Sequence, residues 1–224
     1  MICLQNVYWQ RERRRGHSVL HDITFTIRQG GFRWLLGPSG AGKSSLLALL
    51  NLESLPLTGQ MNILGKSVSN TTPRSALVRL RHRIGMVHQD YNLIHDLSVF
   101  DNVALPLRLQ KRPEDEISEE VKAILSWVGL GAHTGMPSAS LSGGEQQRTA
   151  LARAIVHRPE IILADEPTNA LEESQAYRLL DLFDELNTMG TTVIVATHNE
   201  ALVRRMPRPS LYLENGHLTC EGGE

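Results

Sequence analysis

The chain has 224 residues and a formal net charge of −1 at pH 7, with 41% hydrophobic and 21% charged residues. This composition is typical of a folded globular protein and excludes intrinsic disorder and collagen-like repeats. The near-zero charge gives no overall attraction to nucleic acid. The two cysteines, Cys3 and Cys220, lie near opposite ends of the sequence, which excludes a disulfide framework and a CxxC metal site.

The length fits one domain, and an α/β domain with an inserted segment is natural at this size. No apolar run approaches the roughly 18 residues that a membrane span needs. The sequence starts directly on a strand-like segment, so we expect a cytoplasmic protein without a signal peptide.

The first part of the sequence alternates between short β-like segments and helical patterns. The charged stretch 11–16 indicates a polar turn between the first two strands, and a glycine-rich loop occupies residues 37–42. We expect a helix over residues 43–52 and strands over residues 2–8, 23–27, 34–36, 61–64 and 84–87.

The middle of the sequence is helical in pattern. Apolar side chains between Ile117 and Val128 form one stripe of an amphipathic helix over residues 115–129. A second helix should begin at Ser142, because Ser142 and Glu145 have the spacing of a capping box. A helical insert is therefore expected over residues of about 90–158.

Strand patterns return in the last part. We expect buried strands over residues 161–164 and 192–197, a helix over 173–189, and a hairpin whose turn is Asn215-Gly216. Strands that alternate with helices predict an α/β fold with a mostly parallel sheet and right-handed crossovers.

A phosphate-binding motif follows the third strand. Residues 37–44 match the pattern G-x-x-x-x-G-K-[ST], in which glycines let backbone N–H groups surround phosphates at a helix N-terminus. Lys43 should reach the β- and γ-phosphates, and the Ser44 hydroxyl should bind Mg²⁺. The expected nucleotide-binding residues are Gly37, Pro38, Ser39, Gly40, Ala41, Gly42, Lys43, Ser44 and Ser45.

An acidic pair ends the buried strand 161–164. Ligands of such sheets bind at the carboxyl ends of the strands, so Asp165 is placed to join the Mg²⁺ shell. Glu166 then suits the role of the base that orients and deprotonates the attacking water.

Residues 141–148, Leu-Ser-Gly-Gly-Glu-Gln-Gln-Arg, carry a family signature, and the sequence resembles the ATP-binding-cassette ATPases over nearly its whole length. Gln89 and His198 match that family's Q-loop glutamine and switch histidine. The resemblance implies one domain over residues 1–224, with a phosphate-loop NTPase core, an N-terminal antiparallel β subdomain and the helical insert.

The resemblance also implies how the site works. Two copies pack head to tail in the presence of ATP and Mg²⁺, and the second copy contributes a helix N-terminus, which is a ready anion site. The implied groups are the catalytic Glu166, His198 and Gln89, the Mg²⁺ ligands Ser44, Gln89 and Asp165, and the signature residues Ser142, Gly143, Gly144 and Glu145.

Further segments, including residues 80–90 and 101–107, resemble the cell-division branch of the superfamily, the FtsE family in its alphaproteobacterial form. The implied partner is an integral membrane subunit of the FtsX type, which would hold the protein at the cytoplasmic face of the inner membrane, and no nucleic acid is expected. The apolar side chains Tyr91, Leu93, Ile94 and Leu97 are candidates for the socket that receives this partner, or for core of the insert.

The sequence departs from the family pattern at two places. Glu172 stands where the family usually has an aspartate that links the two sites of the dimer. The aromatic residue that stacks on adenine is expected near the end of the first strand, where Trp9 is our candidate and Tyr8 is the alternative, since strand alternation turns only one of them toward the nucleotide.

Two other functions remain open on the sequence, and a third is disfavoured. The same chemistry would serve an ATPase subunit of a lipoprotein-release or macrolide-export transporter. A cassette of DNA repair or translation is disfavoured, because those carry two cassettes or a long coiled-coil insertion. The change to Glu172 keeps open a regulatory nucleotide-binding module with little hydrolysis.

Overall fold

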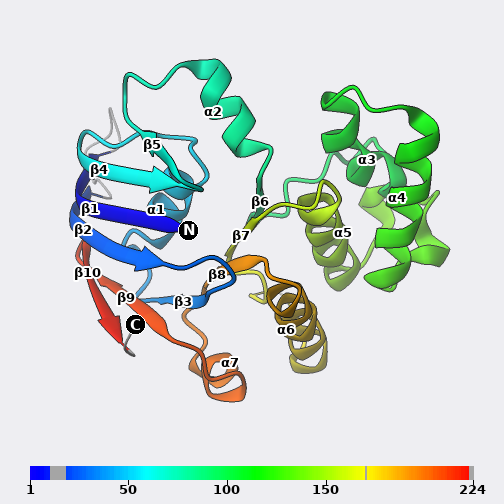
Figure 1. Cartoon of the computed structure of the whole chain (residues 1–224). Coiled ribbons are helices and arrows are strands. Elements are labelled where there is room, and N and C mark those ends of the chain that lie inside the picture. Colours follow the sequence, from blue (N-terminus) through cyan, green and yellow to red (C-terminus); the bar gives the residue numbers. More distant parts are fainter. Residues whose placement is uncertain (11–18, 170, 222–224) are drawn as a thin grey trace.

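The computed structural model describes residues 1–10, 19–169 and 171–221. Its N-terminal part is a four-stranded antiparallel sheet in the order β2 (Val19–Ile27), β1 (Ile2–Gln10), β4 (Thr58–Ile63) and β5 (Lys66–Val68) (Figure 1). This sheet confirms the expected antiparallel subdomain. The arginine-rich stretch 11–16 lies outside the described residues.

The second sheet has six strands, in the order β10 (His217–Glu221), β9 (Ser210–Glu214), β3 (Phe32–Leu36), β8 (Thr192–Ala196), β7 (Ile161–Asp165) and β6 (Ile84–Val87). All pairs from β9 to β6 are parallel, and β10 closes the edge as a hairpin with β9. Every residue of β7 and β8 is buried, which is why both read as continuous apolar runs. The hairpin turn has φ of 49° at Asn215 and 76° at Gly216, as a type I′ turn requires.

Helix α1 (Lys43–Leu50) lies between the two sheets, and its leucines join the inner faces of both in one core (Figure 1). The helix ends two residues earlier than its leucine pattern predicts, because Leu52 adopts a left-handed backbone with φ of 60°. Helices α6 (Glu173–Thr188) and α7 (Glu200–Arg205) cover the other face of the six-stranded sheet, where a second core forms.

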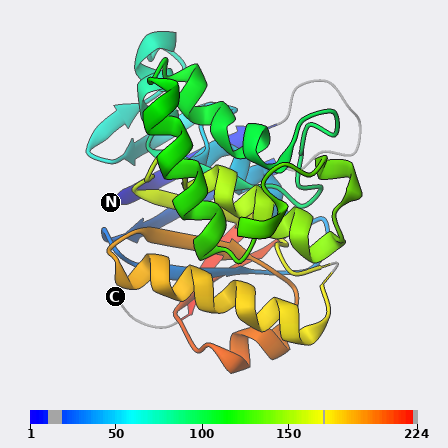
Figure 2. The ribbon, with the colours of Figure 1, turned by 90° about the vertical axis from the view of Figure 1, so that its right-hand side faces the viewer.

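The segment between β6 and β7 is helical. It holds α3 (Val99–Leu109), α4 (Glu114–Trp127), the 3₁₀ turns η1 (Gly131–His133) and η2 (Ser138–Ser140), and α5 (Gly143–Ile155). These helices share a core of their own and form a layer beside α6, with the sheets behind them (Figure 2). The capping box at the start of α5 is present as expected.

Helix α2 (Arg74–Arg81), helix α3 and strand β5 were not expected from the sequence pattern. Each of α2 and β5 is short, and α3 contains Pro106, a residue that normally argues against a helix interior. Among the described residues, no helix combines the length and the apolar character needed to cross a membrane.

Candidate active site

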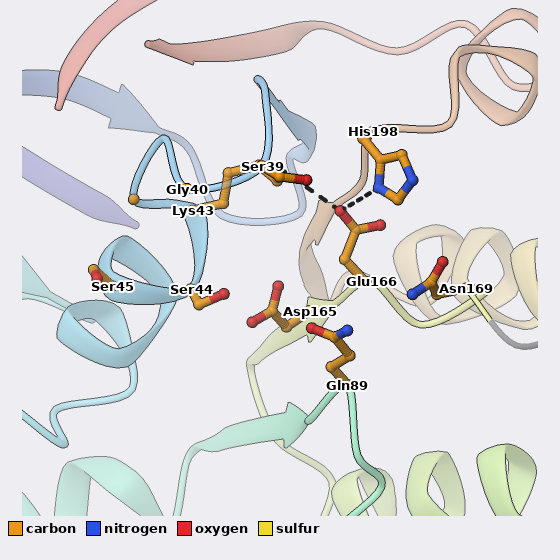
Figure 3. Close-up of a pocket in the computed structure, with 11 residues that line it drawn as sticks. Ser39, Gly40, Lys43, Ser44, Ser45, Gln89, Asp165, Glu166, Asn169 and His198 are labelled. Atoms are coloured by element: carbon orange, nitrogen blue, oxygen red, sulfur yellow. Dashed lines mark hydrogen bonds and ion pairs between the residues drawn. The ribbon is translucent and has the colours of Figure 1, made fainter. Parts of the chain in front are cut away.

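One cavity lies at the carboxyl ends of the parallel strands β3, β6, β7 and β8, the edge at which ligands bind in such sheets. Side chains from separate segments of the chain converge on it (Figure 3). The residues that line it are Ser39, Gly40, Gly42, Lys43, Ser44, Ser45, Gln89, Asp165, Glu166, Asn169 and His198.

The phosphate loop owes its course to two glycines. Gly37 follows β3 with φ of 142°, and a Cβ atom built there would lie 2.0 Å from the carbonyl oxygen of Leu213 in β9. Gly42 precedes α1 with φ of 107° and has no side chain with which to cap the helix. The N-terminus of α1 therefore faces the cavity with its partial positive charge, and no side chain of the N-cap residue covers its backbone N–H groups.

Lys43 lies curled over the loop. Its Nζ donates to the carbonyl oxygen of Gly37 at 2.7 Å and to that of Pro38 at 3.3 Å, and it lies 3.7 Å from Oε1 of Glu166. The ammonium group is thus held between the loop and the acidic end of β7, where an arriving phosphate would meet it.

Asp165, the last residue of β7, is only 7% exposed. Burial raises the pKa of its carboxyl, while the Ser44 hydroxyl donor and the charge of Lys43 act in the opposite direction. Its Oδ1 is buried and has no hydrogen-bond partner among the described residues. An orphaned carboxylate oxygen beside a hydroxyl and near the Gln89 amide fits the hard oxygen ligands of Mg²⁺, so these residues suit that ion.

Glu166 follows Asp165 in a left-handed conformation with φ of 44°, which costs a residue other than glycine about 1–2 kcal/mol. Its N–H donates to the Ala196 carbonyl at 2.9 Å, which ties this turn to β8. Its Oε1 lies 2.8 Å from Nδ1 of His198, so the carboxylate sits between His198 and Lys43 (Figure 3). The strained turn thereby aims Glu166 into the cavity.

The cavity brings together Lys43, Ser44, Gln89, Glu166 and His198, as the sequence predicted. It is also lined by the predicted residues Ser39, Gly40, Gly42, Ser45 and Asp165. Asn169 also lines it and was not anticipated. The available signal was its position, since a polar residue three positions after Glu166 lies on the loop that leaves the same strand end.

Other predicted residues do not line this cavity. Trp9 is 7% exposed and belongs to the core beside α1, where it lines a neighbouring cavity with Ser44 and Ser45, whereas Tyr8 is 41% exposed. Neither aromatic touches the phosphate cavity, so adenine stacking stays a prediction. The signature residues 142–145 lie at the start of α5 in the helical layer.

The apolar residues predicted to receive a membrane partner are partly buried and partly exposed. Leu93 is buried in the core of the α6 face, while Ile94 is exposed at 43%. Arg153 of α5 donates to the carbonyl oxygens of Tyr91 and Asn92, which both adopt left-handed conformations. The segment after Gln89 is therefore fastened to α5.

Residues 20–169 match the family model described as "ABC transporter". The chain is 40% identical over 200 residues to the cell division ATP-binding protein FtsE of Haemophilus influenzae, covering 89% of this chain and 91% of the relative. It is 40% identical over 203 residues to FtsE of Escherichia coli K12, covering 91% of both. The methionine import ATP-binding protein MetN 1 of Listeria monocytogenes is 39% identical over 206 residues, which cover 92% of this chain and 61% of MetN 1.

The fold is also similar to solved structures. The dimeric post-hydrolysis state of the ATP-binding cassette MJ0796, bound to ADP and phosphate, superposes with a TM-score of 0.89 and 32% identity over 100% of both chains. The transporter component cbiO1 of Clostridium perfringens gives a TM-score of 0.85 and 28% identity, covering 97% of this chain and 86% of cbiO1.

Proposed function

The chain belongs to the ABC transporter family of ATPases, and we propose that it drives an FtsX-like membrane partner in bacterial cell division. It is an ATP-binding subunit of an ABC system, and the finer assignment rests on its likeness to the two FtsE proteins over about nine-tenths of each chain. The observation that carries the chemistry is the single cavity in which Lys43, Asp165 and Glu166 face one another.

In the proposed mechanism the phosphate loop binds the triphosphate through backbone N–H groups, and Lys43 leaves the loop carbonyls to pair with the β- and γ-phosphates. Ser44, Asp165 and Gln89 would hold Mg²⁺, which when bound supplies positive charge against the phosphate oxygens. The orphaned Oδ1 of Asp165 supports this set of ligands.

Glu166 acts as the general base in this proposal. Its Oε1 takes a proton from the attacking water, and its fixed position between two cationic or donor groups orients it for that step. Because Nδ1 of His198 faces Glu166, its Nε2 is free to contact the γ-phosphate. Departure of Lys43 toward phosphate would also remove its ion pair with Glu166.

We propose that a second copy of the chain completes the ATP-binding site in a head-to-tail dimer. The N-terminus of α5 lies in the helical layer, outside the cavity formed by its own chain, which supports a role in the site of another copy. The similar cassette MJ0796 was solved as a dimer. Ser142, Gly143, Gly144 and Glu145 would then bound the γ-phosphate from the opposite side.

The decisive test of the proposal is to identify the membrane protein that co-purifies with this chain. Purified from native membranes in detergent with Mg-ATP, the protein should bring an FtsX-like integral membrane subunit with it, and its depletion should leave cells as undivided filaments. Recovery of a lipoprotein-release or macrolide-export permease instead would overturn the cell-division assignment while leaving the ATPase chemistry intact. The location at the cytoplasmic face of the inner membrane follows from the same partner.

A further inference from the structure

His133 contacts the signature helix, although no motif includes it. It ends the η1 turn, and its Nε2 lies 3.1 Å from Oε1 of Glu145. Its side chain is 30% exposed and that of Glu145 is 24% exposed, so water competes only in part for this contact.

The other carboxylate oxygen of Glu145 holds the cap of α5 closed. Oε2 accepts from the backbone N–H of Ser142 at 2.8 Å and from the Ser142 hydroxyl at 2.7 Å. The pKa of Glu145 is held below its ordinary value, first by the Ser142 hydroxyl and then by the Ser142 N–H, with smaller contributions from His133 and Arg148. An ionised carboxylate can only accept, so the single hydroxyl proton of Ser142 is committed to Glu145.

This commitment conflicts with phosphate binding. A phosphate oxygen also only accepts, so Ser142 can donate to the γ-phosphate only after its O–H turns away from Glu145. That rotation leaves only the Ser142 N–H on Oε2, so its cost depends on what else donates to the partly buried carboxylate.

We propose that His133 is a positioning residue that stays on Glu145 while the Ser142 hydroxyl turns to phosphate, and so lowers the cost of opening the cap. This inference rests on the proposed head-to-tail dimer. Nδ1 of His133 is buried without a partner among the described residues, and Nε2 is the ring nitrogen that faces Glu145, so a proton on Nε2 donates to the carboxylate.

The backbone around His133 is fixed well enough for this role. The His133 carbonyl accepts from Met136 N at 2.9 Å, and the Met136 carbonyl accepts from Val99 N at the start of α3 at 2.9 Å. Thr134 is tied to the same helix through Phe100 N at 3.0 Å. The imidazole therefore approaches Glu145 from a braced turn, and its contact does not depend on a long mobile side chain.

The test measures ATP-dependent dimerisation by sedimentation velocity in a Glu166→Gln background with saturating Mg-ATP. His133→Ala should weaken the dimer about tenfold, because each of its two sites loses about threefold. His133→Gln, which keeps an N–H donor at this position, should stay within about twofold of the parent. The exposed His95→Ala is the matched control. Binding of ATP to the monomer, followed with a fluorescent ATP analogue, should be equal in all variants.

A second comparison guards against a merely structural effect. In a Ser142→Ala background no hydroxyl has to turn, so His133→Ala should cause no further loss of dimer. An undiminished loss there, a normal dimer in His133→Ala, or failure of His133→Gln to rescue would overturn the inference. Absence of a dimer in the Glu166→Gln parent itself would instead refute the proposed head-to-tail assembly.

Discussion

The N-termini of α1 and α5 both offer anion sites, but they are built in opposite ways. Gly42 leaves α1 without a side-chain cap, and Lys43 lies beside it. At α5 a complete capping box occupies the same groups, with Ser142 and Glu145 bonded to each other and His133 behind them. An uncapped terminus is open to phosphate at all times, whereas a capped one becomes available only when its internal bonds are exchanged.

This difference assigns the two ends different tasks. The α1 end can bind nucleotide within a single chain, since the backbone geometry is already set by glycines. The α5 end holds its capping box closed, and in our proposal it opens only when the γ-phosphate of the other copy's nucleotide reaches it. In our proposal a complete ATP site therefore combines the permanently open N-terminus of α1 from one copy with the N-terminus of α5 from the other copy, which must first open.

The largest expected effect is that of Glu166→Gln. Loss of the general base should lower ATP turnover by about 10²–10⁴-fold, while ATP binding at the α1 end and ATP-dependent dimerisation at the α5 end persist. Turnover is measured by phosphate release and dimerisation by sedimentation. Normal turnover in this variant would remove Glu166 from its assigned role.

The open α1 end should be broken by Gly37→Ala. The added Cβ would lie 2.0 Å from the Leu213 carbonyl oxygen, so we expect a loss of about 3 kcal/mol or more in the free energy of unfolding, together with loss of ATP binding. The matched control is Gly40→Ala, where φ is 80° and nothing lies within 4 Å of the new Cβ. It should lose only about 1–2 kcal/mol in urea unfolding.

Asp165→Asn should separate stability from function. The raised pKa of Asp165 means that folding disfavours its ionised form, so the penalty is full above the folded-state pKa and absent below the unfolded-state value. The variant should therefore have a higher Tm than the parent at pH 7 without nucleotide, and this gain should shrink as the pH falls into the acidic range. With Mg-ATP the order should reverse, since the amide is a poorer Mg²⁺ ligand. A lower Tm of the variant at pH 7 without Mg-ATP would contradict the burial argument.

The smallest effect concerns a third helix N-terminus. Glu172 occupies the N-cap position of α6 but its side chain makes no capping hydrogen bond. Glu172→Asp should supply one and stabilise the protein by about 0.5–1 kcal/mol, whereas Glu172→Ala should be nearly neutral. Equal stability of the two variants in thermal unfolding would show that this end behaves like the uncapped α1.

The sequence predicts the parts of the fold whose signals are local. The buried strands β7 and β8 follow from apolar runs, and the start of α5 follows from the Ser142 and Glu145 spacing. The bounds of α3 within the helical insert were not predicted, because Pro106 contradicts a helical pattern. Helix α2 was missed because it buries only Leu77 and Leu80, too few for a periodic signal.

The same distinction applies to the site. The phosphate loop and the pair Asp165-Glu166 are contiguous motifs, so the sequence alone predicts them. Asn169 and His133 carry no motif: one is placed by the turn after β7 and the other by hydrogen bonds to α3. Trp9 could not be resolved in advance, because an aromatic residue on a strand serves equally well as core.

The contact between Gly37 and Leu213 bears on the order in which the protein matures on the ribosome. The loop that starts the nucleotide site is shaped against β9, a strand translated long after β3 and paired beside it. A nascent chain that already displays its phosphate-loop motif still lacks this support. Nucleotide capture should consequently begin late in synthesis, after β9 has left the exit tunnel and closed against β3.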